Sequence, residues 1–260
     1  MSVADCLSVR DLSVSFGGVH ALQNVTLSVP TGSIVGLIGP NGAGKSTLLN
    51  CLSGLTRPTQ GDISLGGRSL LGMRPDQIAG LGIGRVFQHP QIIPNMTVLD
   101  NLLVGLHQKM SYSVVAELLN ASQVRRTEHQ SIQAANAVAE RVGLSDCLAL
   151  EAGSLPYGHR KLLELGRAML TAPSFLLLDE PIAGLNDAEI AHLSTLLLEL
   201  RQQAQLSVLL VEHNMGLVKK VCDSVVVLDA GKVISVGTPA QALSDPKVLL
   251  AYLGEVSDDA

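Results

Sequence analysis

The first residues with a clear chemical meaning form a glycine-rich stretch at positions 39–47, Gly-Pro-Asn-Gly-Ala-Gly-Lys-Ser-Thr. Its glycines allow backbone N–H groups to converge on one anion, and a helix that starts near Lys45 adds the positive end of its dipole. The spacing from Gly39 to Ser46 matches the phosphate-binding P-loop pattern, in which the lysine reaches the β- and γ-phosphates and the serine hydroxyl binds Mg²⁺. We therefore predict that the chain binds a nucleoside triphosphate. The residues predicted to surround it are Gly39, Pro40, Asn41, Gly42, Ala43, Gly44, Lys45, Ser46 and Thr47.

The flanking sequence supplies the structural context that this pattern needs. An apolar run at 34–38 predicts a buried strand before the glycines, and leucines after them recur at the spacing of one helix face. These leucines are Leu48, Leu49, Leu52 and Leu55. The alternative is a glycine-rich turn between strand and helix with no ligand, but it leaves the lysine unexplained.

Two carboxylates follow a second apolar run. Asp179 and Glu180 stand at the end of the strand predicted at 175–178, and ligands of open α/β sheets bind at the carboxyl ends of strands. We expect Asp179 to serve Mg²⁺, usually through a coordinated water, and Glu180 to orient and deprotonate the attacking water. The alternative is a strand end that carries two solvated acids.

Two more polar residues follow predicted apolar strands. Gln88 comes after residues 83–87, and His213 comes after residues 207–211. Parallel strands bring their carboxyl ends to one edge of a sheet, so these side chains should converge with Asp179 and Glu180 around one phosphate. Taken alone, His213 would more often be an ordinary histidine. The predicted catalytic residues are Glu180, His213, Lys45 and Gln88, and the predicted metal-binding residues are Ser46, Gln88 and Asp179.

Two weaker signals complete the chemistry. Phe16 is one of only three phenylalanines and sits beside a Gly17-Gly18 turn, so its ring either stacks on the base of the nucleotide or belongs to the core. Residues 154–161 place a proline and a glycine just before a predicted helix. Such a start is a second anion site in principle, although a plain helix start explains it equally well.

Composition excludes several classes of protein. The chain has 260 residues, of which 47% are hydrophobic, and a net charge of −5, which argues against a broad nucleic-acid surface. Four scattered cysteines show no metal-type spacing, so we expect reduced, mostly buried thiols in the cytosol. No secretory signal is evident, and the longest apolar runs are strand-sized. We therefore expect any membrane role to come through a partner.

The order of elements predicts an α/β fold of the P-loop type. Its parts are a mainly parallel core sheet, an N-terminal antiparallel β subdomain and an inserted α-helical subdomain. Short strands are also predicted at 7–16, 25–29 and 61–67. We predict the ATP-binding core at 1–96 and 173–255, the helical subdomain at 97–172, and a short tail at 256–260. Within the insertion, the polar span 122–130 should be a solvated loop or a helix edge.

In their order and spacing these pieces resemble the ATP-binding subunit of an ABC transporter, and the resemblance covers essentially the whole chain. Residues 39–47 match the Walker A motif, Gln88 the Q-loop, residues 176–180 the Walker B motif and His213 the switch histidine. The residues that match the ABC signature are Leu155, Pro156, Tyr157, Gly158 and His159. Those that match the D-loop are Ala183, Gly184, Leu185, Asn186 and Asp187.

Within that family the chain is most similar to ATPases of branched-chain amino acid uptake. The similarity lies in Phe87-Gln88-His89, Met96-Thr97-Val98 with Asn101-Leu102-Leu103, Leu155 to Gly158, Ala183 to Asn186, and a tail from Gly237 to Glu255. The commonest signature is Leu-Ser-Gly-Gly-Gln, from which this chain departs at Pro156, Tyr157 and His159. Asn186 also replaces the usual D-loop aspartate. The branch tends to share Tyr157 and Asn186.

The resemblance implies a head-to-tail dimer in which ATP and Mg²⁺ lie between the P-loop of one subunit and the signature of the other. It implies a second ATPase subunit, the same chain or a related one, two transmembrane permease subunits and, indirectly, an extracytoplasmic solute-binding protein, but no nucleic acid. The expected location is cytoplasmic, peripheral on the inner face of the membrane. The alternative is a soluble ABC-type ATPase in a non-transport role.

Overall fold

The computed structural model describes residues 5–106, 121–204 and 206–255. The chain divides into two compact units. The sheet unit comprises Met1–Ile83, Ser174–Glu180 and Leu197–Ala260, and the helical unit comprises Gly84–Pro173 and Pro181–Leu196. The predicted tail at 256–260 lies outside the described residues, as does 107–120 of the predicted insertion. The functional division at 97 and 172 stays a prediction.

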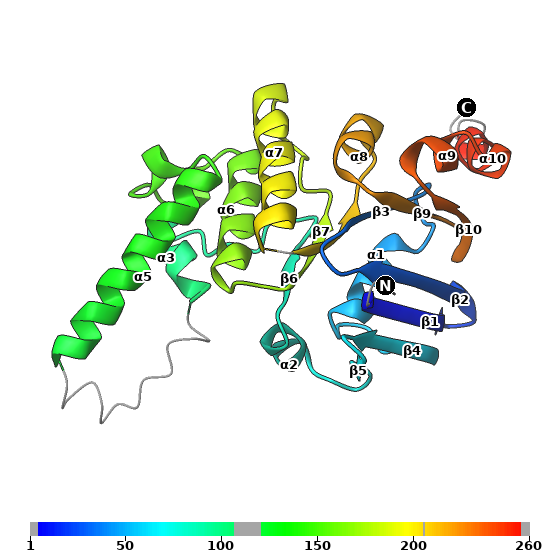
Figure 1. Ribbon diagram of the computed structural model, residues 1–260, viewed down its shortest axis with the longest axis horizontal. Helices are drawn as coiled ribbons and strands as arrows, with labels where there is room; N and C mark the ends of the chain where they lie inside the picture. Colours follow the sequence, from blue (N-terminus) through cyan, green and yellow to red (C-terminus); the bar gives the residue numbers. More distant parts are fainter. Residues whose placement is uncertain (1–4, 107–120, 205, 256–260) are drawn as a thin grey trace. The chain divides into compact units, whose positions relative to one another are not determined.

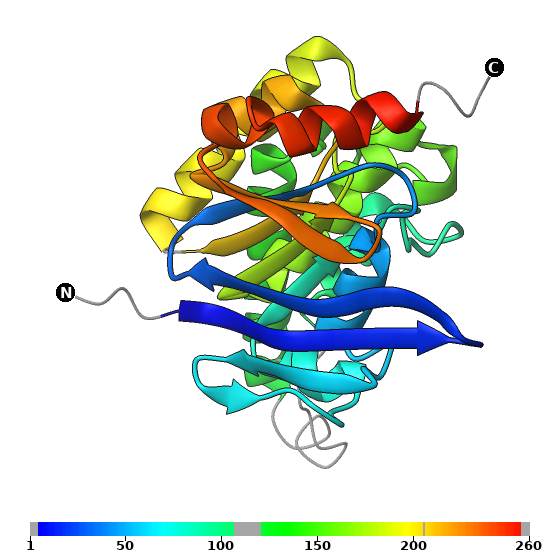
Figure 2. The same ribbon diagram turned by 90° about the vertical axis from the view of Figure 1, so that its right-hand side faces the viewer.

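An antiparallel sheet forms the first layer of the sheet unit. Its strands are β1 (Asp5–Phe16), β2 (Val19–Pro30), β4 (Gln60–Leu65) and β5 (Arg68–Ser69), in the order β2-β1-β4-β5. Figure 2 shows β2, β1 and β4 side by side. Buried and exposed residues alternate along the second half of β2, which is the pattern of a strand with one covered face. β2 is longer than the predicted 25–29 and starts directly after the predicted Gly17-Gly18 turn.

The second sheet has six strands in the order β10-β9-β3-β8-β7-β6 (Figure 1). These are β3 (Ile34–Ile38), β6 (Ile83–Val86), β7 (Phe175–Asp179), β8 (Ser207–Val211), β9 (Ser224–Asp229) and β10 (Lys232–Gly237). Strands β9, β3, β8 and β7 are parallel, whereas β10 runs antiparallel to β9. Every residue of β3, β7 and β8 is buried, as expected for parallel strands covered on both faces. The predicted fold class is confirmed.

Five helices of the sheet unit follow its strands in the described part of the chain. They are α1 (Lys45–Leu52), α2 (Pro75–Gly80), α8 (Met215–Val221), α9 (Pro239–Leu243) and α10 (Pro246–Glu255). A capping box is present at Thr238, and α9 and α10 lie along β10 (Figure 2). The expectation for Leu55 was wrong: α1 ends at Leu52, the chain turns at Gly54 with φ +73, and Leu55 is 53% exposed. Helix α2 was not predicted, because six residues that begin with a proline carry little periodicity.

The helical unit contains α3 (Val98–Val104), α5 (Ala121–Arg141) and α6 (Tyr157–Leu170), with 3-10 turns at Ser145–Cys147 and Ala152–Ser154. Helix α7 (Asp187–Ala204) begins in this unit and ends in the sheet unit. The polar span 122–130 belongs to α5, so the helix-edge alternative holds. In α6 the buried face includes Leu162, Leu163 and Leu165, whereas Met169 is only half buried.

The described cysteine side chains are free thiols. Cys51 and Cys222 are buried and Cys147 is half buried, whereas the side chain of Cys6 lies outside the described ones. Burial raises the pKa of Cys51 to about 11 and that of Cys222 to about 12. Both thiols are therefore protonated and unreactive near neutral pH.

Candidate functional site

The glycine-rich loop packs closely against backbone from distant parts of the sheet unit. Gly39 adopts φ +148, and a Cβ there would stand 1.9 Å from the carbonyl oxygen of Leu228 at the end of β9. A Cβ on Gly44, at φ +102, would stand 2.6 Å from the carbonyl oxygen of Ala21. Both positions therefore require glycine. Gly42, at φ +75, has nothing within 4 Å of its added Cβ, so it is needed for conformation and not for space.

The turn between β9 and β10 fixes the same loop. Gly231 donates its N–H to the carbonyl oxygen of Ala43 at 3.0 Å, and its own carbonyl accepts the N–H of Gln23 at 2.8 Å. The loop is thus tied to both sheets at once. This places it as a preformed backbone cradle at the start of α1, with Gly44 as the residue before the first helical position.

Lys45 is the buried cation of the cradle. Its side chain is 7% exposed, and its Nζ donates to the carbonyl oxygens of Gly39 at 2.7 Å and Pro40 at 2.8 Å. An ammonium group that bridges the two ends of the loop stiffens it and places a full positive charge where the backbone amides converge. Phosphate oxygens are the ligands that this combination favours.

The pairing of β3, β8 and β7 aligns the carboxyl ends of these strands at one edge of the sheet, which is called the rim below. Leu37 of β3 pairs with Val211 of β8, and Val211 in turn pairs with Asp179 of β7. Leu37, Val211 and Asp179 thus form one row across the sheet. Just beyond this row, the glycine-rich loop follows β3, Glu180 follows β7 and His213 follows β8. Of the four side chains predicted to converge, Asp179, Glu180 and His213 lie at this edge of the sheet unit, whereas Gln88 belongs to the helical unit.

Glu180 and His213 contact each other at that edge. The Oε1 atom of Glu180 lies 3.2 Å from Nε2 of His213, with side chains 25% and 40% exposed. Glu180 has φ +48, a left-handed conformation that is strained for a glutamate, and its N–H donates to the carbonyl oxygen of Val211 at 2.9 Å. The strained backbone and the histidine together fix where the carboxylate points.

Oxygen donors suited to Mg²⁺ are present on the cradle and on the rim. Ser46 offers an exposed hydroxyl at the start of α1, and Asp179 offers a carboxylate that is only 4% exposed at the end of an apolar strand. Hydroxyl, carboxylate and phosphate oxygens are the ligands that Mg²⁺ prefers. Among the described residues, no group of three or more His, Cys, Asp or Glu could hold a metal ion.

Phe16 ends β1 immediately before the Gly17-Gly18 turn, and its ring is 54% exposed. The core alternative is therefore wrong, because a ring used as core would be buried. An exposed aromatic face at the end of a strand is available for stacking.

The helical unit holds the remaining predicted residues. The hydroxyl of Tyr157 donates to the carbonyl oxygen of Gln88 at 2.8 Å, so the residue that replaces the first signature glycine is bonded to the Q-loop backbone. Leu155 is buried, and Pro156 precedes the first residue of α6 with φ −54. A proline at this position is compatible with a helix start because it lacks only an N–H that the helix does not use.

The D-loop segment lies directly against the signature. A Cβ on Gly158 would stand 2.6 Å from the carbonyl oxygen of Gly184, so this glycine is required by close backbone packing. His159 Nε2 lies 2.8 Å from Oε1 of Glu189 on α7. Two departures from the common signature, Tyr157 and His159, therefore make specific contacts within the helical unit.

Asn186 has a structural role in the same segment. Its side chain accepts the N–H of Glu189 at 3.0 Å, and Glu189 Oε2 accepts the N–H of Asn186 at 2.8 Å. This reciprocal pair is a capping box at the start of α7. The hydrogen bond from the Asn186 backbone and, after it, the contact with His159 lower the pKa of Glu189. Ala183, Leu185 and Asp187 complete the segment, and Asp187 is the first residue of α7.

Sequence reasoning missed two buried acids. Glu212 is 3% exposed, and its Oε2 accepts the N–H of His213 at 3.2 Å, so it shapes the turn that carries the histidine. Glu164 is 2% exposed on α6 and contacts the Q-loop. The sequence does carry a signal for Glu164, because a charged residue stands there among Leu162, Leu163 and Leu165.

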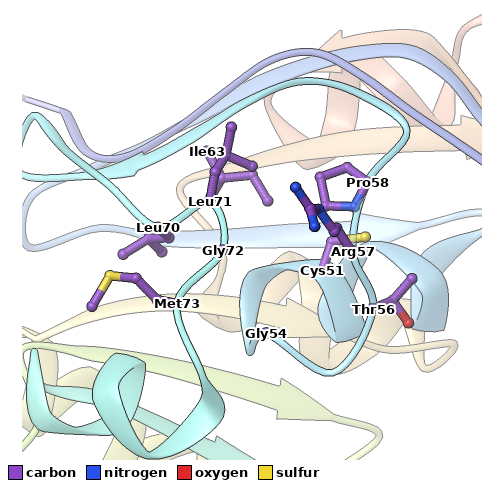
Figure 3. Close-up of a pocket in the computed structure, with 10 residues that line it drawn as sticks. All are labelled: Cys51, Gly54, Thr56, Arg57, Pro58, Ile63, Leu70, Leu71, Gly72 and Met73. Atoms are coloured by element: carbon purple, nitrogen blue, oxygen red, sulfur yellow. The ribbon is translucent and has the colours of Figure 1, made fainter.

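A separate pocket of about 200 Å³ lies at the carboxyl end of α1, away from the phosphate cradle at its amino end (Figure 3). Its walls come from the end of α1, from β4 and from the segment after β5. The lining residues are Cys51, Gly54, Thr56, Arg57, Pro58, Ile63, Leu70, Leu71, Gly72 and Met73.

The fold and the rim define a class of protein, a P-loop cassette that binds and hydrolyses a nucleoside triphosphate. Comparison with known families makes this more specific. The model of the family described as ABC transporter matches residues 22–183, and that described as Branched-chain amino acid ATP-binding cassette transporter matches residues 232–258. The chain belongs to the ATP-binding cassettes of the ABC transporter family, and it is an ATPase of that class.

Individual relatives match nearly the full length of the chain. It is 43% identical over 249 residues to the high-affinity branched-chain amino acid transport ATP-binding protein LivG of Escherichia coli (strain K12), covering 96% of this chain and 98% of LivG. It is 41% identical, with the same coverage, to BraF of Pseudomonas aeruginosa, which has the same description. A cassette of an ABC transporter solved in its ADP conformation matches with a TM-score of 0.82 and 33% identity, covering 96% of this chain and 99% of that one.

These findings confirm the predicted resemblance and give no support to a non-transport role. In the described ranges no helix is both long enough and apolar enough to span a membrane.

Proposed function

We propose that this chain hydrolyses ATP to power a membrane importer of branched-chain amino acids. The observation that carries the hydrolysis is the pair of Glu180 and His213, 3.2 Å apart on the edge that also bears the phosphate cradle. The solute is proposed from the whole-length similarity to LivG and BraF. Other amino acids and related small polar solutes are the neighbouring candidates.

Binding uses the cradle and Phe16. The backbone amides of residues 39–47 and the ammonium group of Lys45 hold the β- and γ-phosphates, while the exposed ring of Phe16 stacks on the base. Ser46, Asp179 and Gln88 would hold Mg²⁺, which neutralises phosphate charge when bound. Stacking is tolerant of the base, so selectivity among purines should be loose.

Hydrolysis uses the two strand ends. Glu180 orients a water molecule and accepts its proton while the water oxygen attacks the γ-phosphorus and the bond to the bridging oxygen of ADP breaks. His213 holds the Glu180 carboxylate and senses the γ-phosphate. The strained backbone of Glu180 supports this role, because such strain is retained mainly where the surrounding structure uses it.

Transport needs partners. The proposed assembly has a second ATPase subunit, the same chain or a related one, whose signature residues 155–159 complete the ATP site. Two permease subunits lie in the membrane, an extracytoplasmic protein delivers the solute, and this chain sits on the cytoplasmic face. ATP would favour the closed pair because it contacts both subunits, and hydrolysis would remove that preference. The helical subdomain, proposed at 97–172, would contact the permeases.

Co-purification tests the assembly. The tagged chain is isolated from native membranes in detergent, and its companions are identified by mass spectrometry. Hydrophobic subunits that co-purify and ATPase activity in the complex are expected. Nucleic acid in place of such subunits would contradict the proposal.

Uptake tests the solute. Cells that lack this chain are compared with cells that carry it for uptake of labelled leucine, isoleucine and valine, with labelled lysine as the control. Loss of uptake confined to the three branched-chain amino acids is expected. Equal uptake of these amino acids in both strains would refute the proposed solute.

A further inference from the structure

Helix α6 contacts the backbone of the Q-loop through three side chains. Tyr157 bonds the carbonyl oxygen of Gln88, as described above. Glu164 accepts two backbone N–H groups, from Phe87 at 3.2 Å on Oε2 and from Gln91 at 3.1 Å on Oε1. Arg167 donates to the carbonyl oxygen of Gln91. Residues 157, 164 and 167 lie on one face of a helix, so the loop rests along that face.

Glu164 is the central contact. One carboxylate oxygen bonds the residue just before Gln88 and the other bonds a residue three positions after it, so the carboxylate spans the loop that carries Gln88. Further along, Asn101 of α3 bonds both the N–H and the carbonyl oxygen of Ile93, at 2.8 and 2.9 Å. Gln88 therefore stands on a segment that is fixed on both sides.

The burial of this carboxylate is costly. Desolvation raises the pKa of Glu164 to about 7, although the two backbone amides, Arg167 at 3.9 Å and Lys161 all oppose the rise. Those two cations are on α6 itself, and the loop presents uncharged amides. A leucine would avoid this desolvation, but it would leave the N–H groups of Phe87 and Gln91 without their acceptor, so what the carboxylate contributes here is its pair of contacts with the loop.

We infer that Glu164 is a positioning residue for ATP hydrolysis, which sets the place of Gln88 relative to the helix that begins at the signature. The inference rests on the proposed function, since it takes Gln88 to act at the γ-phosphate. Glu164 and Arg167 thereby add to the direct bond between Tyr157 of the signature and the backbone of Gln88 within one subunit.

The first test is Glu164→Gln in the purified complex with its membrane subunits. The amide keeps the size of the side chain, but its NH₂ group faces a backbone N–H, so one of the two bonds is lost. We expect kcat to fall about tenfold while KM for ATP changes less than about twofold, as for a small displacement of a catalytic group. Glu140→Gln is the matched control, because Glu140 is exposed on α5 of the same unit and its loss removes the same charge.

A double-mutant cycle with Gln88→Ala separates positioning from general support. If Glu164 acts through Gln88, Glu164→Gln should have almost no further effect on kcat once Gln88 is alanine. Full additivity of the two changes would overturn the inference. So would an unchanged kcat in Gln88→Ala, because no role of Gln88 would then remain to be positioned.

Hydrogen exchange provides a local readout. In Glu164→Gln the amides of Phe87 and Gln91 should exchange faster while those of β3 and β8 keep their wild-type rates. Faster exchange in the core strands would mean general loosening and would contradict the inference. Arg167→Lys, which keeps the charge but loses the guanidinium fork, is the second variant and should give the same pattern more weakly.

These experiments distinguish a failure of the proposed function from a failure of the inference on Glu164. If the wild-type complex does not turn over ATP, the proposed function is wrong whatever Glu164 does. If it does and Gln88→Ala is impaired, the cycle decides on Glu164 alone.

Discussion

The edge of the parallel sheet and the signature face of the helical unit are built in different ways. At the sheet edge, the geometry is set mainly by the backbone. Glycines pack against carbonyl groups, strands are paired, and Glu180 has a strained backbone conformation. In the helical unit, long side chains such as Tyr157, Glu164 and His159 reach the backbone or side chains of neighbouring segments. The first arrangement is suited to hold a fixed geometry, and the second can be re-formed without breaking a sheet.

The sharpest way to break this comparison is Glu180→Gln. Loss of the carboxylate should lower ATP turnover by about 10²–10⁴-fold and leave ATP binding largely intact, since the cradle is untouched. Turnover in the purified complex and binding of a fluorescent ATP analogue measure the two effects. Equal turnover in the variant and the wild type would remove Glu180 as the base.

Gly39→Ala tests whether the cradle depends on backbone packing. A Cβ at 1.9 Å from the carbonyl oxygen of Leu228 cannot be accommodated without moving the loop or β9. We expect ATP binding to be lost and the free energy of unfolding to fall by about 1–3 kcal/mol or more. Gly42→Ala is the control because it has the unusual φ but free space, and it should cost less. An equal loss in both variants would show that conformation matters and packing does not.

Phe16→Ala sharpens the comparison at the outer part of the sheet unit. Removing an exposed stacking face should cost about 1–3 kcal/mol of ATP affinity, with a smaller effect on maximal rate. Titration with ATP and GTP measures it, and both nucleotides should weaken alike. An unaltered affinity would place the base elsewhere.

The last prediction concerns the effect of pH on the stability of the helical unit. Folding raises the pKa of Glu164 from its ordinary value of 4.5 to about 7, so between these values the folded chain binds the proton more tightly than the unfolded chain. The contribution of this group to stability is therefore complete below about pH 4.5 and is lost as pH rises to about 7, by up to about 1.4 kcal/mol per pH unit. Denaturant unfolding of the wild type and of Glu164→Gln should show this difference in slope. If the stability of the two proteins changed with pH in the same way, the pKa of Glu164 would not be raised by folding.

How much the sequence revealed follows the same division. Asp179, Glu180 and His213 could be placed because each ends a strand that is apolar throughout, and strands of that kind are parallel and aligned. Gly39 and Lys45 follow a fixed pattern of spacing. The contacts of Tyr157, His159 and Glu164 could not be placed, because they depend on how far a side chain reaches across segments 30 to 77 residues apart. The prediction for Leu55 was wrong for a local reason, because the turn at Gly54 ends the helix before Leu55.

One contact also bears on how the protein is made. Gly231 joins the phosphate loop to β2 through bonds to Ala43 and from Gln23, and Leu228 supplies the surface on which Gly39 rests. The phosphate loop therefore lacks these contacts until residue 231 has left the ribosome. A nascent chain stalled before residue 224 should not retain ATP, however complete its glycine-rich motif is.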